Sequence, residues 1–502
     1  MDVPGIADVP LYVLMALAAP VLLYIYGTWN HTYFKKRSIP GPTPYPFIGN
    51  MTGIFFHSMT TWRQKFGNVF GVFQGAAPCF VISDLEIVKE VLVKSSNVFR
   101  NRKKFELVPY PFSLGLFFLD DALWKRVRSI MTPTFSGRKL RQMSTSINHC
   151  AETLTSNFAK VIGKQEGVNI KEYFGAFAVD VISRTAFSVK VDSQNDFSNP
   201  FVINVKEMFT PPKFIRSILQ LNVVLPSLST FLKTVGLGIF SQSIIKFFET
   251  NIKEMINQRL NNRESMREQR TDFLQLLMDA EVEDEQGYPG ANGKHVVRRL
   301  STDEVVAQGT LFYLAGYEAV SSTLNFASHH LATNPEVQEK AYAEMKEKLG
   351  DEEPNYDNIK KLKYLDNVIT ETLRVCPPVI VLTRRASETI RIKDVTIYEG
   401  QTVFIPVFAL QRDPQLFKDP NSFKPERHNE KSNPLSFLAF GYGPRICIGM
   451  RLAWVEMKIA LIHVLRSVKF ERMPNTEDEL TFKKVSTLKP AEDIVLKLSH
   501  RC

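Results

Sequence analysis

Hydrophobic positions along most of the chain recur with the 3.6-residue period of helices. A long helical stretch begins at Ser301, which forms a capping-box pattern with Glu304 three residues later. A second helical stretch runs from 364 to 375 and ends before Pro377 and Pro378. The pattern therefore predicts a mainly helical fold.

Alternating and turn-bounded segments predict a small β region beside these helices. Residues 69–74 and 79–83 predict a hairpin around Gly75, residues 85–94 a helix after it, and residues 390–405 further strands. We therefore expect a mainly α fold with a small β region.

The first residues follow another pattern. Residues 9–34 contain no charged side chain, and 11–26 is almost wholly apolar, which is long enough to span a bilayer if the helix accommodates Pro20. The basic cluster 35–37 follows at once, so the body is expected on the cytosolic side of a single-pass anchor. A cleaved signal peptide is the alternative, but it would need a basic segment before the apolar run. We expect an anchor over 1–34, a proline-rich connector over 35–50 and one domain over 51–502.

Composition is consistent with one large body. The chain has 502 residues, is 44% hydrophobic and contains 37 phenylalanines, enough for a large apolar core. The polar stretch 284–299 predicts a surface loop rather than a linker. The five cysteines are scattered and odd in number, so no disulfide framework is expected: Cys79, Cys150, Cys376, Cys447 and Cys502. The net charge of +10 comes without a nucleic-acid-binding motif, and it favours anionic lipid and an acidic protein partner over nucleic acid.

Candidate chemistry centres on the glycine-rich loop from Phe440 to Gly449, which contains Cys447. A helical pattern follows the cysteine, so backbone N–H groups can point at its sulfur and stabilise a thiolate. Gly441 and Gly443 allow a tight turn, Gly449 allows close approach of the backbone to a porphyrin, and Arg445 can reach a propionate. The loop predicts a haem-thiolate site, although such a cysteine alone is more often a small buried residue.

Two further motifs precede this loop. Glu371 and Arg374 lie at i and i+3 on one helix face, and Arg427 follows in a Pro-Glu-Arg turn. Each pattern alone is typical of a solvated surface. Together and in this order they predict a buried structural triad of Glu371, Arg374 and Arg427.

With the cysteine loop, the ExxR helix and the PER loop in this order, the chain resembles the cytochrome P-450 superfamily. The resemblance covers nearly the whole chain and is closest to the microsomal family 3 (3A-like) monooxygenases, on matches such as Trp124-Lys125-Arg126-Val127-Arg128 and Ala315-Gly316-Tyr317-Glu318. It implies the cytochrome P-450 fold, haem b as cofactor with Cys447 as its axial iron ligand, and propionate contacts from Trp124, Arg128 and Arg384.

The resemblance also implies surroundings and partners. These are the endoplasmic reticulum membrane, an NADPH-dependent cytochrome P-450 reductase with cytochrome b5 as a second candidate, and a lipophilic small-molecule substrate. The implied substrate pocket is apolar and consists of Phe112, Phe117, Phe118, Leu314, Ala315, Ala319, Val379 and Val381. The segment 209–221 is implied to dip into the membrane, although an ordinary amphipathic helix fits its pattern equally well.

One departure from the family bears on mechanism. The family's usual threonine after Glu318 is Ala319 here, and alanine cannot relay a proton. We therefore expect Glu318, Ser322, Thr323 or an ordered water to deliver protons. A smaller departure, His428 in place of a usual phenylalanine, is interpreted as a packing variation.

Three functions stay open. The first is a membrane-bound monooxygenase that uses O2 and electrons from the reductase. The second, suggested by Ala319, is a thromboxane-synthase-like isomerase of a lipid endoperoxide, which needs neither. The third is a non-catalytic haem protein.

Overall fold

The computed structural model describes residues 11–51, 55–210, 228–261, 272–279, 300–483 and 487–501, with a few positions between 211 and 227. The expected surface loop at 284–299 and six of the thirteen residues of the segment 209–221 lie outside the described residues.

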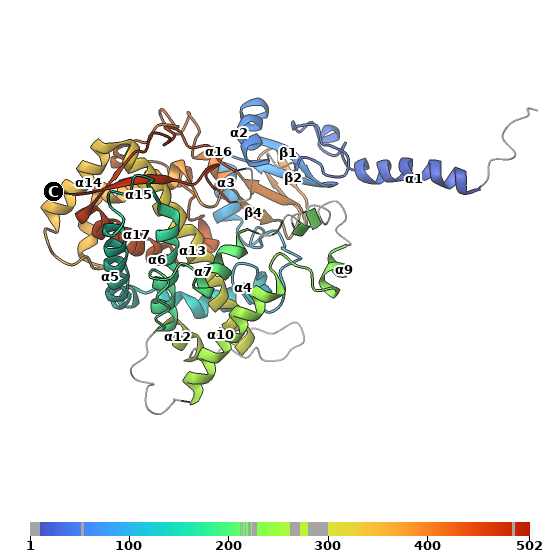
Figure 1. The fold of residues 1–502 in the computed structure, drawn as a ribbon. Helices are drawn as coiled ribbons and strands as arrows, with labels where there is room; N and C mark the ends of the chain where they lie inside the picture. Colours follow the sequence, from blue (N-terminus) through green and yellow to red (C-terminus); the bar gives the residue numbers. More distant parts are fainter. Residues whose placement is uncertain are drawn as a thin grey trace, which may run out of the picture.

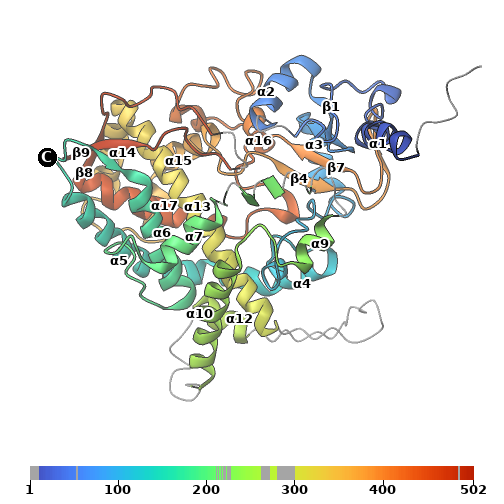
Figure 2. The ribbon, with the colours of Figure 1, turned by 45° about the vertical axis from the view of Figure 1, so that its right-hand side comes forward.

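Helices make up most of the described body, as the hydrophobic period predicted (Figure 1). The longest is α13, which occupies the middle of the body near α6 and α7 (Figure 2). Their bounds are α2 Phe55–Phe66, α3 Leu85–Lys89, α4 Asp121–Met131, α5 Gly137–Ala159, α6 Ile170–Phe187, α7 Pro200–Met208, α9 Leu228–Thr234, α10 Gln242–Asn261, α12 Phe273–Asp279, α13 Thr302–Thr333, α14 Pro335–Lys348, α15 Lys363–Val375, α16 Val407–Leu410 and α17 Met450–Ser467.

The expected capping box begins α13. The Ser301 hydroxyl accepts from the Glu304 N–H at 3.2 Å, and the Glu304 carboxylate accepts from the Ser301 N–H at 2.8 Å. These contacts satisfy N–H groups that have no partner inside the helix. Beyond this cap, α13 packs along α6 and also contacts α15 and α17, so it is the central helix of the described body.

Three small sheets complete the described body. The predicted hairpin is present: β1 (Val69–Gln74) pairs with β2 (Ala77–Ile82) around Gly75, whose φ is +59°. A parallel pairing joins β2 to β7 (Thr402–Ile405), and β4 (Leu382–Arg385) adds antiparallel to β7. The other pairs are β5 (Ile390–Ile392) with β6 (Val395–Ile397), and β9 (Val495–His500) with both β3 (Val168–Asn169) and β8 (Val468–Glu471). The expected β-rich stretch 390–405 therefore contains three strands.

The N-terminal helix α1 (Leu11–Thr28) projects away from the body (Figure 1). Its large apolar side chains are exposed, among them Leu17 at 66% and Leu22 at 64%. Within the described part of the chain, no helix meets the combined length and apolarity needed to cross a bilayer.

The connector after α1 is bound to the body. Phe34 is buried against Gly71, and the Gly71 N–H donates to the Pro40 carbonyl at 2.9 Å. The proline-rich stretch therefore lies along the hairpin and is not a free spacer.

Candidate functional site

The Cys447 loop is closed by its own backbone. The Cys447 N–H donates to the Phe440 carbonyl at 2.9 Å, and Gly441 and Gly443 both have a φ of +73°, the left-handed region that favours glycine. A Cβ at Gly443 would lie 1.9 Å from the Leu92 carbonyl oxygen, so only glycine fits there. At Gly449 a Cβ would meet only the Phe135 ring at 3.9 Å. The protein itself therefore tolerates a side chain at Gly449.

The helix start beyond the loop points at the sulfur, as expected. Burial raises the pKa of the Cys447 thiol, while the N–H groups of Gly449 and Met450 and the charges of Arg128 and Arg102 act in the opposite direction. These donors and cations favour the thiolate over the thiol. The side chain is nevertheless solvent-accessible, so a ligand can reach the sulfur.

Several guanidinium groups gather beside this loop, and among the described residues none of them forms a salt bridge with a carboxylate, although the charges of Asp120 and Asp121 act on Arg445. Arg102, Arg384 and Arg445 donate only to backbone carbonyls among the hydrogen bonds of the described residues. Burial lowers the pKa of Arg102 to about 10 and those of Arg384 and Arg445 to about 9, and the neighbouring guanidinium charges add to this effect. Such a cluster of cations calls for an anionic ligand.

Arg445 itself has one nitrogen atom that lacks a hydrogen-bond partner within the described structure. Its guanidinium stacks 4.1 Å from the ring centroid of Trp124, and two of its nitrogens bind the carbonyls of Arg100 and Leu119. Its Nη1 is buried and has no partner in the described structure. The structure therefore brings the predicted residues Trp124, Arg384 and Arg445 into one cluster, and a ligand with carboxylates next to the sulfur, as haem has, fits it.

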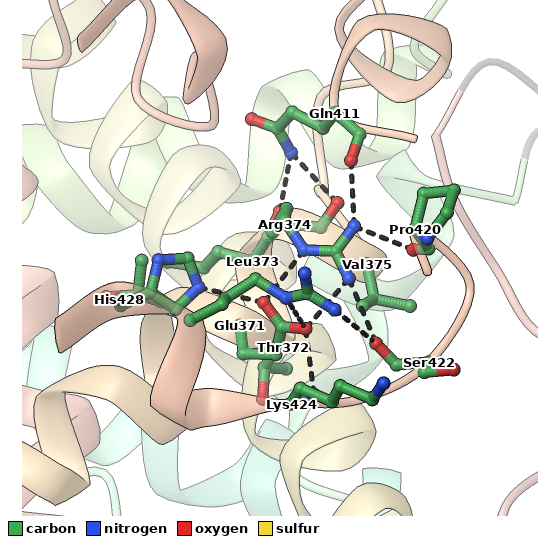
Figure 3. Close-up of polar contacts among 12 residues, drawn as sticks. Glu371, Thr372, Leu373, Arg374, Val375, Gln411, Pro420, Ser422, Lys424 and His428 are labelled. Carbon is green, nitrogen blue, oxygen red and sulfur yellow. Dashed lines mark hydrogen bonds and ion pairs between the residues drawn. The ribbon is translucent and has the colours of Figure 1, made fainter. Parts of the chain in front are cut away.

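The structure brings the three predicted triad residues together: Glu371 and Arg374 are fully buried (Figure 3), and the Arg427 side chain is 13% exposed. The Glu371 carboxylate accepts from Arg374 Nε and Nη2, both at 2.8 Å, from Arg427 Nε at 2.9 Å and from the Lys424 N–H at 2.9 Å. Arg374 also donates to the carbonyls of Gln411, Pro420 and Ser422. The ExxR pair thus attaches α15 to the segment between 411 and 427.

The interpretation of His428 as a packing variation is wrong. Its Nε2 lies 2.8 Å from Glu371 Oε2, so the imidazole is a further polar partner of the triad (Figure 3). A phenylalanine at this position could not make this contact. This contact could not be predicted from the sequence, because the two residues lie 57 positions apart.

The centre of α13 has one accessible face. Ala315 is exposed and Ala319 is half-buried, although most of the helix around them is buried. Thr323 is buried, and its hydroxyl donates to the Ala319 carbonyl at 2.7 Å. Glu318 is buried too, and it accepts from Ser322 Oγ at 3.0 Å and pairs with Lys171 of α6 at 3.4 Å.

The residues expected to line a substrate pocket differ in exposure. Phe117, Val379 and Ala315 are exposed, and Phe118 and Leu314 are partly buried. Phe112 is buried against Phe240 at 5.9 Å between ring centroids, and Val381 packs against the cluster around Phe70.

Comparison with known proteins shows the family of this chain. The family model described as "Cytochrome P450" matches residues 39–498. The chain belongs to the cytochrome P450 family. It is 37% identical to Cytochrome P450 3A29 of Sus scrofa, over 99% of this chain and 98% of the relative. It is also 37% identical to Cytochrome P450 3A13 of Mus musculus, over 96% and 95%, and 36% identical to Cytochrome P450 3A5 of Homo sapiens, over 99% and 98%.

Membership identifies the cofactor and the reaction class. The chain is a haem b protein and a monooxygenase oxidoreductase. Two residues that contact or act on predicted site residues could not be identified from the sequence: Arg102, whose charge acts on Cys447, and Lys171, which pairs with Glu318. Neither belongs to a motif, and both meet their partners across more than a hundred residues.

Proposed function

We propose that this chain is a membrane-bound haem-thiolate monooxygenase that hydroxylates lipophilic substrates such as steroids, lipids or xenobiotics. The observation that carries the proposal is the Cys447 sulfur, which faces backbone N–H groups and lies beside arginines that form no salt bridge with a carboxylate of the described residues. In this account O2 is the oxidant and an NADPH-dependent flavoprotein reductase supplies the electrons.

Each part of the site has a task in this reaction. When bound through a thiolate, haem supplies an iron centre that activates oxygen. The N–H groups of Gly449 and Met450 stabilise the negative charge on Cys447, and Arg128 adds to this effect. Arg102, Arg384 and Arg445 hold the carboxylates of the cofactor, and the triad around Glu371 fixes the chain next to the loop.

Substrate recognition rests on apolar contact in this proposal. Phe117, Phe118, Leu314, Ala315 and Val379 present apolar atoms that remain accessible or half-buried. Each well-buried side chain of such a surface contributes about 1.5–3 kcal/mol, with little demand on direction. We therefore expect broad selectivity based on shape and lipophilicity.

The N-terminal helix supports a membrane location, and the net charge supports an acidic protein partner. The exposed apolar side chains of α1 support a membrane anchor over 1–34, with the connector 35–50 and the catalytic domain 51–502 on the cytosolic side of the endoplasmic reticulum. The net charge of +10 supports an acidic redox partner, the reductase or cytochrome b5.

The surroundings of Ala319 favour a second candidate function. Ala319 offers no hydroxyl on the accessible face of α13, and the hydroxyls of Ser322 and Thr323 already donate to Glu318 and to the Ala319 carbonyl. An isomerase of a lipid endoperoxide, whose substrate arrives with its oxygen already reduced, would need no proton relay at this position.

Oxygen consumption separates the two candidates. The full chain in lipid vesicles, supplied with reductase, NADPH and a set of steroids and other lipophiles, should consume O2 and form hydroxylated product. A matched assay offers a lipid endoperoxide without reductase or NADPH. Rearrangement there, with no O2 uptake in the first assay, would overturn the monooxygenase proposal.

A further inference from the structure

A half-buried lysine, Lys171, is hydrogen-bonded to the serines beside the acid Glu318 of α13. Lys171, in the first turn of α6, donates from Nζ to Ser322 Oγ at 2.5 Å and to Ser321 Oγ at 2.9 Å. The Ser322 hydroxyl donates in turn to Glu318 Oε1 at 3.0 Å, which also lies 3.4 Å from Nζ. Ammonium, hydroxyl and carboxylate thus form one continuous hydrogen-bonded chain.

The two ends of this chain lie in different surroundings. The Glu318 side chain is 9% exposed, whereas the Lys171 side chain keeps 26% of its surface exposed. Ala319, next to Glu318 in the sequence, lies on the accessible face of the helix. The chain therefore leads from partly solvated Lys171 to a buried acid beside the position that has no hydroxyl.

We infer that Lys171 is a positioning residue for proton delivery, which feeds protons through Ser322 to Glu318 and so replaces the missing hydroxyl at Ala319. This inference rests on the proposed monooxygenase function, because only that reaction consumes protons on this face of α13.

The proton step balances without another reactant. A proton leaves Lys171 Nζ for Ser322 Oγ as the Ser322 proton passes to Glu318 Oε1, giving a neutral amine and a neutral carboxylic acid. Glu318 then gives its proton to a water molecule on the accessible face of α13 and returns to a carboxylate, and the amine takes a proton from solvent water.

The environment of Lys171 eases this transfer. Burial lowers the pKa of Lys171 from 10.5 to about 8, and Lys489 adds to this effect while Glu318 opposes it. The Tyr317 ring lies 5.7 Å from Nζ. A proton therefore leaves this ammonium more easily than it leaves an ordinary lysine.

The test compares Lys171→Arg and Lys171→Met in the full-length haem protein. Arginine keeps the positive charge and the hydrogen bonds but does not release its proton, whereas methionine removes both. The matched control is Lys253→Met, since Lys253 also pairs with an acid of α13, Asp303, at 3.4 Å, about 22 Å along the helix from Glu318.

Both Lys171 variants should lower product per electron at least about tenfold, with a matching rise in peroxide, while Lys253→Met stays within about twofold of wild type. Normal coupling in Lys171→Arg with loss in Lys171→Met would show that only the ion pair matters and would overturn the inference. Normal coupling in both variants would overturn it as well.

Unfolding supplies a readout independent of turnover. Between about pH 8 and 10.5 the unfolded chain binds a proton at Lys171 that the folded chain lacks, so stability from this group rises with pH. The unfolding constant of wild type relative to Lys171→Arg should fall by up to about tenfold per pH unit in this window. If the unfolding constants of wild type and Lys171→Arg changed with pH in the same way, the inference would be contradicted. Absence of O2 uptake in wild type would instead contradict the proposed function.

Discussion

Glu371 illustrates at the residue scale how one buried anion depends on its partners. Burial alone would raise the pKa of this carboxyl, but hydrogen bonds from Arg374 and His428 and the charge of Arg374 lower it to about 2. Because the folded pKa lies below the ordinary 4.5, the stabilisation is complete above pH 4.5 and is lost as pH falls toward 2. It amounts to about 3 kcal/mol.

Replacing Glu371 by glutamine should therefore destabilise the protein strongly. The variant leaves Arg374 buried without its counter-charge, which typically costs about 3–5 kcal/mol. Denaturant unfolding at pH 7 and haem content measure the effect, and the acid-dependent loss below pH 4.5 should shrink in the variant. The exposed Asp357, which pairs with Arg141 at the surface, gives a control: Asp357→Asn should change stability by less than about 1 kcal/mol. Equal effects of the two substitutions would contradict this account.

His428 carries a separate prediction. His428→Phe restores the family's usual residue but removes a hydrogen bond to a buried carboxylate, worth about 1.5–3 kcal/mol. The unfolding free energy should fall by this amount, and His428→Ala should lose at least as much. A phenylalanine variant as stable as wild type would mean that packing compensates for the lost contact.

At the scale of elements, α13 depends on its capping box. Ser301→Ala removes the acceptor for the Glu304 N–H and should cost about 1 kcal/mol. Ser136 offers a matched control, because it is the N-cap of α5 but makes no side-chain capping bond. Ser136→Ala should therefore be nearly neutral in thermal unfolding, and equal losses at both caps would count against the assigned role of Ser301.

Local sequence patterns were sufficient to predict these elements, whereas the contacts between elements could be identified only in the structure. The box at Ser301, the stop of α15 before Pro377 and the hairpin at Gly75 depend on neighbouring residues, so they can be read from the sequence. The pair of Lys171 with Glu318 joins two helices across 147 positions, and on a helix such a lysine is indistinguishable from a solvated one. The hydrogen bond of His428 and the charge of Arg102 likewise act only through the fold.

At the scale of the whole molecule, the exposed apolar side chains of α1 are available to bind lipid. Deleting residues 1–28, which leaves the buried Phe34 in place, should move the protein from the membrane fraction to the soluble fraction at low salt, because apolar side chains such as Leu17 and Leu22 no longer bind lipid. The haem spectrum should be unchanged, since the site lies beyond residue 100. Membrane binding that persists in full would place the main anchor elsewhere.

The body as a whole brings distant segments to one sulfur. Arg102, Arg128 and the start of α17 all act on Cys447, although they come from separate parts of the chain. The cysteine loop and Arg445 could be identified from their own residues, and Arg128 and Arg384 from the family resemblance, but Arg102 could not, because it belongs to no sequence motif. The haem-thiolate assignment therefore depends on both the loop and these arginines.

The absorbance of the reduced, carbon-monoxide-bound haem of Cys447→Ser tests the central claim most directly. A serine cannot supply the thiolate, so the thiolate-type band should disappear even where haem is retained. Cys376→Ser is the control, since Cys376 is fully buried, burial raises the pKa of its thiol and its sulfur lies 3.7 Å from His330 Nε2. The account predicts loss of the band in the first variant and an unchanged band in the second; a band that persists in Cys447→Ser would contradict it.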